Sequence, residues 1–158
     1  LLANLPPDLS AERRAIVTKA CELVGKVNYF WGGKSSAIGW DSRWGKPAKV
    51  TASGSRTTGT VRPFGLDCSG FVDWVFNNAC GYILGQGGGA HAQHNNCTDI
   101  TFTEVLPGDL LFYPDDSHVG IAVGRDKNGE ILVIHCASGY NNVVLTTAKG
   151  FTKAAEML

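Results

Sequence analysis

The stretch "LDCSGFVDWVF", residues 66–76, decides how the fold is interpreted, because it places a cysteine where a helical pattern begins. Apolar residues at positions 68, 71, 72, 75 and 79 fall on one helical face, which predicts a helix over residues 68–79. Asp67 precedes this helix as its N-cap, since a carboxylate there accepts hydrogen bonds from free backbone N–H groups. Cys68 is therefore expected in the first helical turn.

A cysteine in a first helical turn has two chemical uses. The unpaired N–H groups and partial positive charge of a helix N-terminus favour the thiolate, which is the nucleophilic form of the side chain. The same N–H groups can receive the oxyanion that forms when a thiolate attacks a carbonyl. Asp67 acts mildly against the first effect, because it adds negative charge beside the sulfur. A lone cysteine at a helix start is more often an inert core residue, so catalysis requires a base nearby.

Two of the four histidines, His118 and His135, lie in one predicted β-hairpin. The turn "DKNG" contains an Asn-Gly pair, a strong hairpin signal, between strands predicted at 118–124 and 130–137. Any loop with an even number of residues puts both histidines on one face. A four-residue loop places His135 opposite Gly120 and diagonal to His118, at about 7 Å between Cα atoms. One imidazole beside the thiol and a second orienting the first would form a triad, whereas the competing interpretation is a surface histidine and a separate core histidine.

The segment "HAQHNNC", residues 91–97, has a spacing that metal ligands use. His91, His94 and Cys97 supply nitrogen and sulfur ligands of the kind that zinc binds. The surrounding glycine-rich connector, residues 85–97, supplies neither a fourth ligand nor a supporting element, so chance composition is the preferred interpretation. No metal and no other cofactor is expected.

The remaining cysteines give no catalytic signal. Cys136 points away from His135 by strand alternation, and Cys21 lies beside the buried stripe of a predicted helix, so both are expected as small core residues. The chain has five cysteines, an odd number that cannot all pair within one chain. Whether Cys80 and Cys97 pair is left open by the sequence.

Helices precede strands along the chain. A helix is predicted over residues 11–25, before the helix that begins at Cys68. Four predicted strands follow, at 109–113, 118–124, 130–137 and 142–147. This segregation predicts an α+β fold in which N-terminal helices pack on an antiparallel sheet. Residues 34–63 have no period of 2 or 3.6 and predict a long inserted surface loop, in which Trp40 and Trp44 either bind a ligand or only pin the loop to the body.

The composition indicates one globular domain over residues 1–158, with a core of its own. There are 14 basic and 14 acidic residues, so neither a nucleic acid nor an anionic membrane surface is expected as a partner. No apolar run approaches the roughly 20 residues of a membrane-spanning helix, so no membrane insertion is expected. The chain opens with "LLANLPPDLS" and no initiator methionine, and we expect a domain excised from a larger secreted protein.

Five motifs occur in a recognisable order: "VNYFWGG", "GLDCSGFVDWVF", "LPGDLLFY", "HVGIAVG" and "VIHCASG". Between about Ala11 and Thr147 the chain resembles the NlpC/P60 family of papain-like cysteine peptidases, which cleave peptidoglycan stem peptides. The resemblance implies a papain-like core with Cys68 as the nucleophile. It implies that His118 is the general base and then the acid, and that His135 orients His118. The expected reaction is hydrolysis of the bond between γ-D-glutamate and a diamino acid, through a thioester.

The resemblance also implies a cleft for the stem peptide. Tyr29 and Trp31, in "VNYFWGG", are expected to line it, with Tyr29 beside the nucleophile and aiding the oxyanion. Asp67 and Ser69 flank the nucleophile, and in some members the corresponding residues help to hold the stem peptide. The inserted loop is longer than the usual link in the family and is expected to add a wall to the cleft. A substrate of this kind implies an extracellular or cell-envelope location, and other domains of the parent chain count among the candidate partners.

Three alternatives remain at the level of sequence. The first is an amidase built on the same core and cutting nearer the glycan. The second is a catalytically silent peptidoglycan-binding module, in which Tyr29, Trp40 and Trp44 would form a platform. The third is a metal-dependent hydrolase. An intact set of one cysteine and two histidines favours the cysteine peptidase, because a pure binding module has no need of it.

Overall fold

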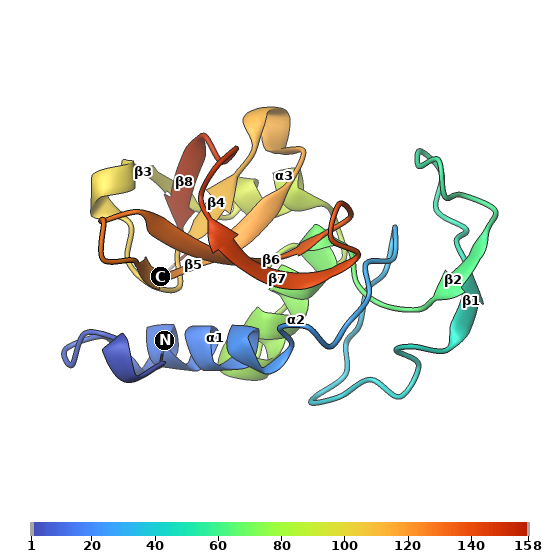
Figure 1. The fold of residues 1–158 in the computed structure, drawn as a ribbon, viewed down its shortest axis with the longest axis horizontal. Coiled ribbons are helices and arrows are strands. Elements are labelled where there is room, and N and C mark those ends of the chain that lie inside the picture. Colours follow the sequence, from blue (N-terminus) through green and yellow to red (C-terminus); the bar gives the residue numbers. More distant parts are fainter. Residues whose placement is uncertain (1, 158) are drawn as a thin grey trace.

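A six-stranded antiparallel sheet with helices packed against it forms the body of the computed structural model, which describes residues 2–157 (Figure 1). The sheet has the strand order β3-β8-β4-β5-β6-β7. Its strands are β3 (Thr98–Ile100), β4 (Leu110–Phe112), β5 (Val119–Arg125), β6 (Ile131–Ala137), β7 (Asn142–Thr147) and β8 (Lys153–Glu156). The helices are α1 (Ala11–Glu22), α2 (Cys68–Cys80) and α3 (Ala90–Asn95), with short 3-10 turns η1 (Leu2–Asn4), η2 (Phe102–Glu104) and η3 (Pro114–Asp116). The predicted α+β fold is confirmed.

Helix α2 begins where the sequence predicts, because its N-cap works as expected. The Asp67 carboxylate accepts a hydrogen bond of 2.7 Å from the Gly70 N–H, and the helix ends at Gly81, whose positive φ of 82° suits a glycine C-cap. Helix α1 is capped by Ser10, which accepts from the Arg13 N–H at 3.2 Å. It stops at Glu22, three residues before the predicted end at residue 25.

The main core lies between the helices and one face of the sheet. Helices α1 and α2 pack on each other, and α2 lies against β5 and β6 (Figure 1). The largest fully buried side chains of this core belong to Trp74, Phe71, Phe76, Phe112, Ile16 and Leu66. Full burial of one such side chain contributes about 1.5–3 kcal/mol, so this packing fixes the start of α2 against the sheet.

The insert, residues 34–63, has structure of its own. Strands β1 (Pro47–Lys49) and β2 (Val61–Pro63) form an antiparallel pair that lies beyond α2, away from the large sheet (Figure 1). Trp44 is buried and packs edge-on to Trp74 of α2 at 5.9 Å between ring centroids, whereas Trp40 is exposed. Trp44 therefore pins the insert to the body, and the three-residue platform of the binding-module hypothesis is wrong for this residue.

The expectation that the connector, residues 85–97, has no supporting element is wrong. The connector contains α3, and β3 and β8 are two further strands that the sequence pattern did not predict. All five cysteines are free thiols within the part of the chain that the structure describes, including Cys80 and Cys97. Across residues 2–157 no helix is long and apolar enough to cross a membrane.

Candidate active site

Cys68 lies half-buried in the first turn of α2, where the start of β5 meets it. Burial raises the pKa of the Cys68 thiol to about 11, and the adjacent Asp67 carboxylate adds to this rise. Three groups act in the opposite direction: the Val119 N–H, the Lys34 ammonium and the Ser69 N–H. The resting thiol is therefore neutral, and it is surrounded by donors that favour a developing negative charge.

The two histidines share one face of the β5–β6 hairpin, but the route to this register differs from the prediction. The loop between the paired residues Arg125 and Ile131 spans residues 126–130, which is an odd number. A β-bulge between Ala122 and Gly124 shifts the pairing by one residue and restores the register, so that Ile121 pairs with Ile134. The residues before the bulge then follow the predicted alignment.

Gly120 faces His135, as a four-residue loop would have placed it. A Cβ atom built at Gly120 would lie 3.0 Å from the His135 Cβ and 2.5 Å from the Val133 Cγ1. The contact with Val133 is shorter than real Cβ atoms show, and the contact with His135 is tighter than nine in ten real ones, so a larger residue at position 120 would force these side chains to shift.

A chain of hydrogen bonds runs from His118 through His135 to Thr146 on β7. His118 Nε2 lies 2.7 Å from His135 Nδ1, and His135 Nε2 lies 2.8 Å from Thr146 Oγ1. Thr146 Oγ1 donates its hydrogen to the Thr147 carbonyl at 2.8 Å, so it can only accept from His135. This assigns the proton of His135 to Nε2, leaves its Nδ1 as an acceptor, and makes His118 Nε2 a donor. His118 Nδ1 is then the unprotonated nitrogen, free to act as a base.

Both imidazoles are neutral near pH 7. Burial, followed by the neighbouring His135, lowers the pKa of His118 to about 4, and burial lowers the pKa of His135 to about 4. Phe151 packs edge-on to His135 at 5.3 Å between ring centroids, and Tyr113 packs edge-on to His118 at 4.9 Å. These aromatic rings exclude water and hold the two histidines in place.

The two aromatic residues predicted to line the cleft lie in different surroundings. Burial raises the pKa of Tyr29 well above its ordinary value, with Cys68 and then Asp67 as further causes, so the phenol stays protonated beside the sulfur. Trp31 instead donates its indole N–H to the Ser53 carbonyl of the insert at 2.9 Å. Tyr29 thus lies near the thiol, and Trp31 connects the site to the insert.

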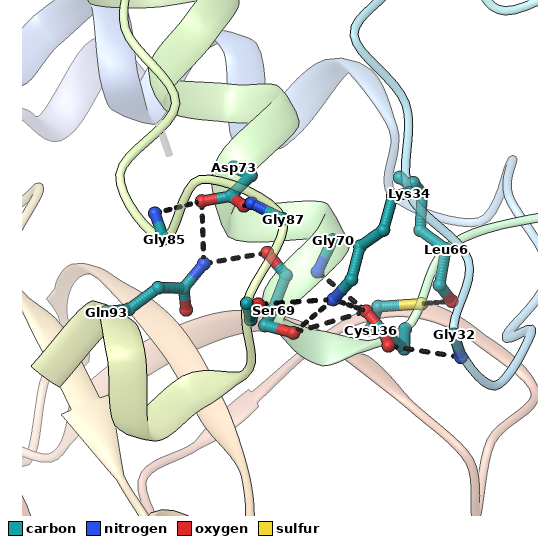
Figure 2. Close-up of polar contacts among 12 residues, drawn as sticks. Gly32, Lys34, Leu66, Ser69, Gly70, Asp73, Gly85, Gly87, Gln93 and Cys136 are labelled. Atoms are coloured by element: carbon teal, nitrogen blue, oxygen red, sulfur yellow. Dashed lines mark hydrogen bonds and ion pairs between the residues drawn. The ribbon is translucent and has the colours of Figure 1, made fainter. Parts of the chain in front are cut away.

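Lys34 engages both residues that flank the nucleophile, and no sequence motif indicated it. Its Nζ donates to Asp67 Oδ1 at 2.9 Å and to Ser69 Oγ at 2.6 Å. Figure 2 shows the Lys34 side chain pointing toward Ser69. Lys34 is the first residue of the insert and stands 33 positions before Asp67 in the sequence. A signal could have come only from the charge requirement, because a buried carboxylate beside a thiol needs a cation.

A second polar network holds the connector against α2. The Asp73 carboxylate accepts from the Gly85 N–H at 2.7 Å and from Gln93 Nε2 at 2.9 Å, and Gln93 Nε2 also donates to the Ser69 carbonyl at 2.8 Å (Figure 2). Asp73, Ser69 and Gln93 are all buried. This network fixes the connector against the first turns of α2, which carry Ser69 and Asp73.

His91 and His94 do not form a metal site with Cys97. Both histidines contact Asp116 of η3, at 3.0 Å and 2.8 Å, and the Cys97 thiol instead faces the Gln93 carbonyl at 3.3 Å. No group of three or more potential ligands suited to a metal ion occurs within residues 2–157. The contacts tie α3 to the turn that precedes His118.

Comparison with known proteins gives one family. The NlpC/P60 family model matches residues 25–153. The "Probable endopeptidase Rv2190c" of Mycobacterium tuberculosis is 31% identical over 120 residues, which cover 75% of this chain and 23% of that protein. This chain spans less than a quarter of the length of the curated relatives it matches.

Two solved structures illustrate the range of similar folds. The NlpC/p60 domain of the peptidoglycan hydrolase SagA superposes with a TM-score of 0.64 and 26% identity, covering 92% of this chain and 98% of that one. RipD of Mycobacterium tuberculosis, described as a non-catalytic NlpC/p60 domain protein adapted to peptidoglycan binding, gives a TM-score of 0.68 at 17% identity. It covers 95% of this chain and 100% of that chain. The predicted papain-like NlpC/P60 core is thus confirmed as the fold, and similar folds occur with and without catalysis.

Proposed function

The chain belongs to the NlpC/P60 family, and from this premise we propose that it is a peptidoglycan hydrolase that works as a cysteine endopeptidase on stem peptides. The scissile bond in this proposal joins γ-D-glutamate to a diamino acid. The observation that carries the proposal is the hydrogen-bond chain from His118 to Thr146, since it leaves a basic nitrogen on His118 next to the β5 residue whose N–H faces the thiol. A substrate of this kind places the protein in the cell envelope or outside the cell.

In the first step, His118 Nδ1 takes the proton of the thiol while Cys68 Sγ attacks the carbonyl carbon of the scissile amide. The neutral resting pair exchanges this proton once the carbonyl is in place, because the negative charge then passes from sulfur to the carbonyl oxygen. That oxyanion faces the N–H groups at the start of α2, where the partial positive charge favours it. The Tyr29 hydroxyl is a further donor beside the sulfur.

In the second step, the C–N bond breaks and the leaving amine takes the proton from His118 Nδ1, which leaves a thioester on Cys68. A water molecule then gives a proton to His118 Nδ1 and attacks the thioester carbonyl. Release of the carboxylic acid regenerates the thiol. His135 Nδ1 accepts from His118 Nε2 throughout, so it stabilises the imidazolium and keeps the ring oriented.

The test is mass spectrometry of purified muropeptides incubated with the native chain and with Cys68→Ala, under reducing conditions and with a chelator present. We expect fragments cut after γ-D-glutamate from the native chain only. Cleavage by Cys68→Ala would contradict the thiol mechanism, and fragments cut between the glycan and the peptide would favour an amidase. Cleavage by the native chain that appears only when the chelator is left out would favour a metal-dependent hydrolase.

A peptidoglycan-binding module is the second candidate function, and the similarity to RipD favours it. In that case native chain and Cys68→Ala would bind muropeptides equally and neither would release fragments. The expected release of fragments by the native chain separates the two functions in the same experiment.

A further inference from the structure

Three acceptors converge on the ammonium group of Lys34, directly beside the nucleophile. Lys34 Nζ lies 2.9 Å from Asp67 Oδ1, 2.6 Å from Ser69 Oγ and 3.5 Å from the Gly88 carbonyl oxygen. A carboxylate, a hydroxyl and a carbonyl around one point make a site for a primary ammonium. In this chain the protein's own lysine already occupies that site.

Other donors also hold the Asp67 carboxylate in place, including the Ser69 hydroxyl, which donates to Oδ1 at 3.3 Å. The Gly70 N–H donates to its Oδ1 at 2.7 Å and the Gly32 N–H donates to its Oδ2 at 3.2 Å. The Asp67 side chain is only 10% exposed, whereas that of Lys34 is 31% exposed. A ligand that approaches from solvent therefore meets the ammonium first and the carboxylate only if Lys34 moves away.

The position of this cation bears on which peptides the site accepts. Asp67 and Ser69 flank Cys68 in the sequence, so a substrate group bound here lies close to the scissile bond. A peptide with a free N-terminal amine near that bond would bring a second positive charge against Lys34, and like charges repel strongly in a half-buried site. An acylated amine carries no charge, and its carbonyl oxygen can accept from Lys34 Nζ.

From these contacts we infer that Lys34 is a specificity-determining residue, which makes the site select stem peptides whose N-terminal amine is acylated, as it is in a peptide still joined to the glycan by an amide. The inference rests on the proposed function and names the substrate class for the same site. It also gives the insert a role, because Lys34 is its first residue and the following segment is held on α2 by Gly39 and Asn78.

The test compares two synthetic peptides of the sequence L-Ala-γ-D-Glu-diamino acid. The N-terminal amine of L-Ala is free in one peptide and acetylated in the other. Binding is measured by calorimetry on Cys68→Ala, in which no bond is cut, so the result does not depend on catalysis. We expect the acetylated peptide to bind more tightly when Lys34 is present. Lys34→Met in that background should shift the ratio of the two dissociation constants about tenfold toward the free amine, because Asp67 can then pair with the substrate ammonium.

Two further variants make the result specific. Lys34→Gln removes the charge but keeps a donor, and it should shift the ratio of dissociation constants in the same direction. It takes the place of Lys34→Met in the test if the methionine variant does not fold. Lys46→Met removes an exposed cation from the same insert and should leave the ratio unchanged. Three results would overturn the inference. The first is a ratio of dissociation constants that neither Lys34→Met nor Lys34→Gln changes by more than twofold. The others are tighter binding of the free-amine peptide with Lys34 in place, and no binding of either peptide. Hydrolysis by the native chain, measured separately, tests the proposed function alone.

Discussion

At the scale of single residues, Thr146 is not part of the cysteine and histidine set, yet its hydrogen bond determines which nitrogen of His118 carries the proton. Its hydroxyl fixes the proton of His135 on Nε2, and this choice fixes the proton of His118 on its own Nε2. A histidine can serve as a base only through the nitrogen that lacks a proton. In the proposed mechanism, Thr146 is therefore a positioning residue that acts through two imidazoles.

Replacement of Thr146 by valine removes the acceptor while keeping the shape of the side chain. We expect kcat on muropeptides to fall about tenfold with little change in KM, because the substrate contacts stay and the tautomer of His135 is no longer fixed. Thr146→Ser is the matched control and should restore both kcat and the tautomer. Nitrogen NMR shifts of His135 report the tautomer directly, and a loss of kcat in Thr146→Val with the native tautomer retained would refute this role.

At the scale of elements, the β5–β6 hairpin combines features that the sequence predicts with one, the β-bulge, that it does not. Its strands, its turn and the common face of His118 and His135 follow from alternation and from the Asn-Gly pair. The bulge between Ala122 and Gly124 does not, because the extra residue leaves no mark in the hydrophobic pattern. The predicted face is right only because the bulge compensates for an odd loop.

The other elements also differ in how far local sequence pattern predicts them. Helix α2 has a cap, a buried stripe and a glycine stop, so its limits are predictable to within a residue. Strands β3 and β8 have only three and four residues, too few for a period to register, and α3 has six residues and no side-chain cap. The contact of Lys34 with Asp67 and that of Thr146 with His135 depend on tertiary packing and strand pairing, which local pattern does not contain.

Gly120 of the β5–β6 hairpin has no room for a larger side chain. We expect Gly120→Ala to lower the free energy of unfolding by about 1–3 kcal/mol and to reduce kcat, since the new methyl group would displace Val133 and the His135 ring. Gly139→Ala is the control, because a Cβ there meets no atom within 4 Å. Urea denaturation and muropeptide kinetics measure the two effects, and equal stabilities for the two variants would disprove the steric argument.

At the scale of the whole molecule, the buried histidines make folding depend on pH. Burial lowers the pKa of both His118 and His135 to about 4 in the folded chain, below the ordinary histidine pKa of about 6.5. Between these values the unfolded chain binds more protons, so the free energy of unfolding falls as the pH drops from about 6.5 to about 4. Their contribution is complete above pH 6.5.

His94 has the opposite sign and must be separated from this effect. Burial lowers its pKa, but hydrogen bonds with Asp99 and Asp116 outweigh burial and the net pKa is raised. Thermal unfolding midpoints are measured as a function of pH for the native chain and for His135→Asn. The contribution of His94 cancels in this comparison, because His94 is present in both chains. We expect a smaller loss of stability on acidification in His135→Asn, and parallel curves for the two chains would contradict the assignment.

The surroundings of Cys68 come from four segments that are far apart in the sequence: Lys34 at the start of the insert, Asp67 to Ser69 at the start of α2, Gly88 in the connector and Val119 on β5. Contacts of such long sequence separation close late in folding, because each must first overcome the entropy of a long loop. A nascent or partly folded chain therefore has the cysteine but not the cation, donors and base that would make it a hydrolase. In the proposed function, hydrolysis therefore requires the completed tertiary structure, and the order of folding events would keep the thiol inactive until the chain is fully formed.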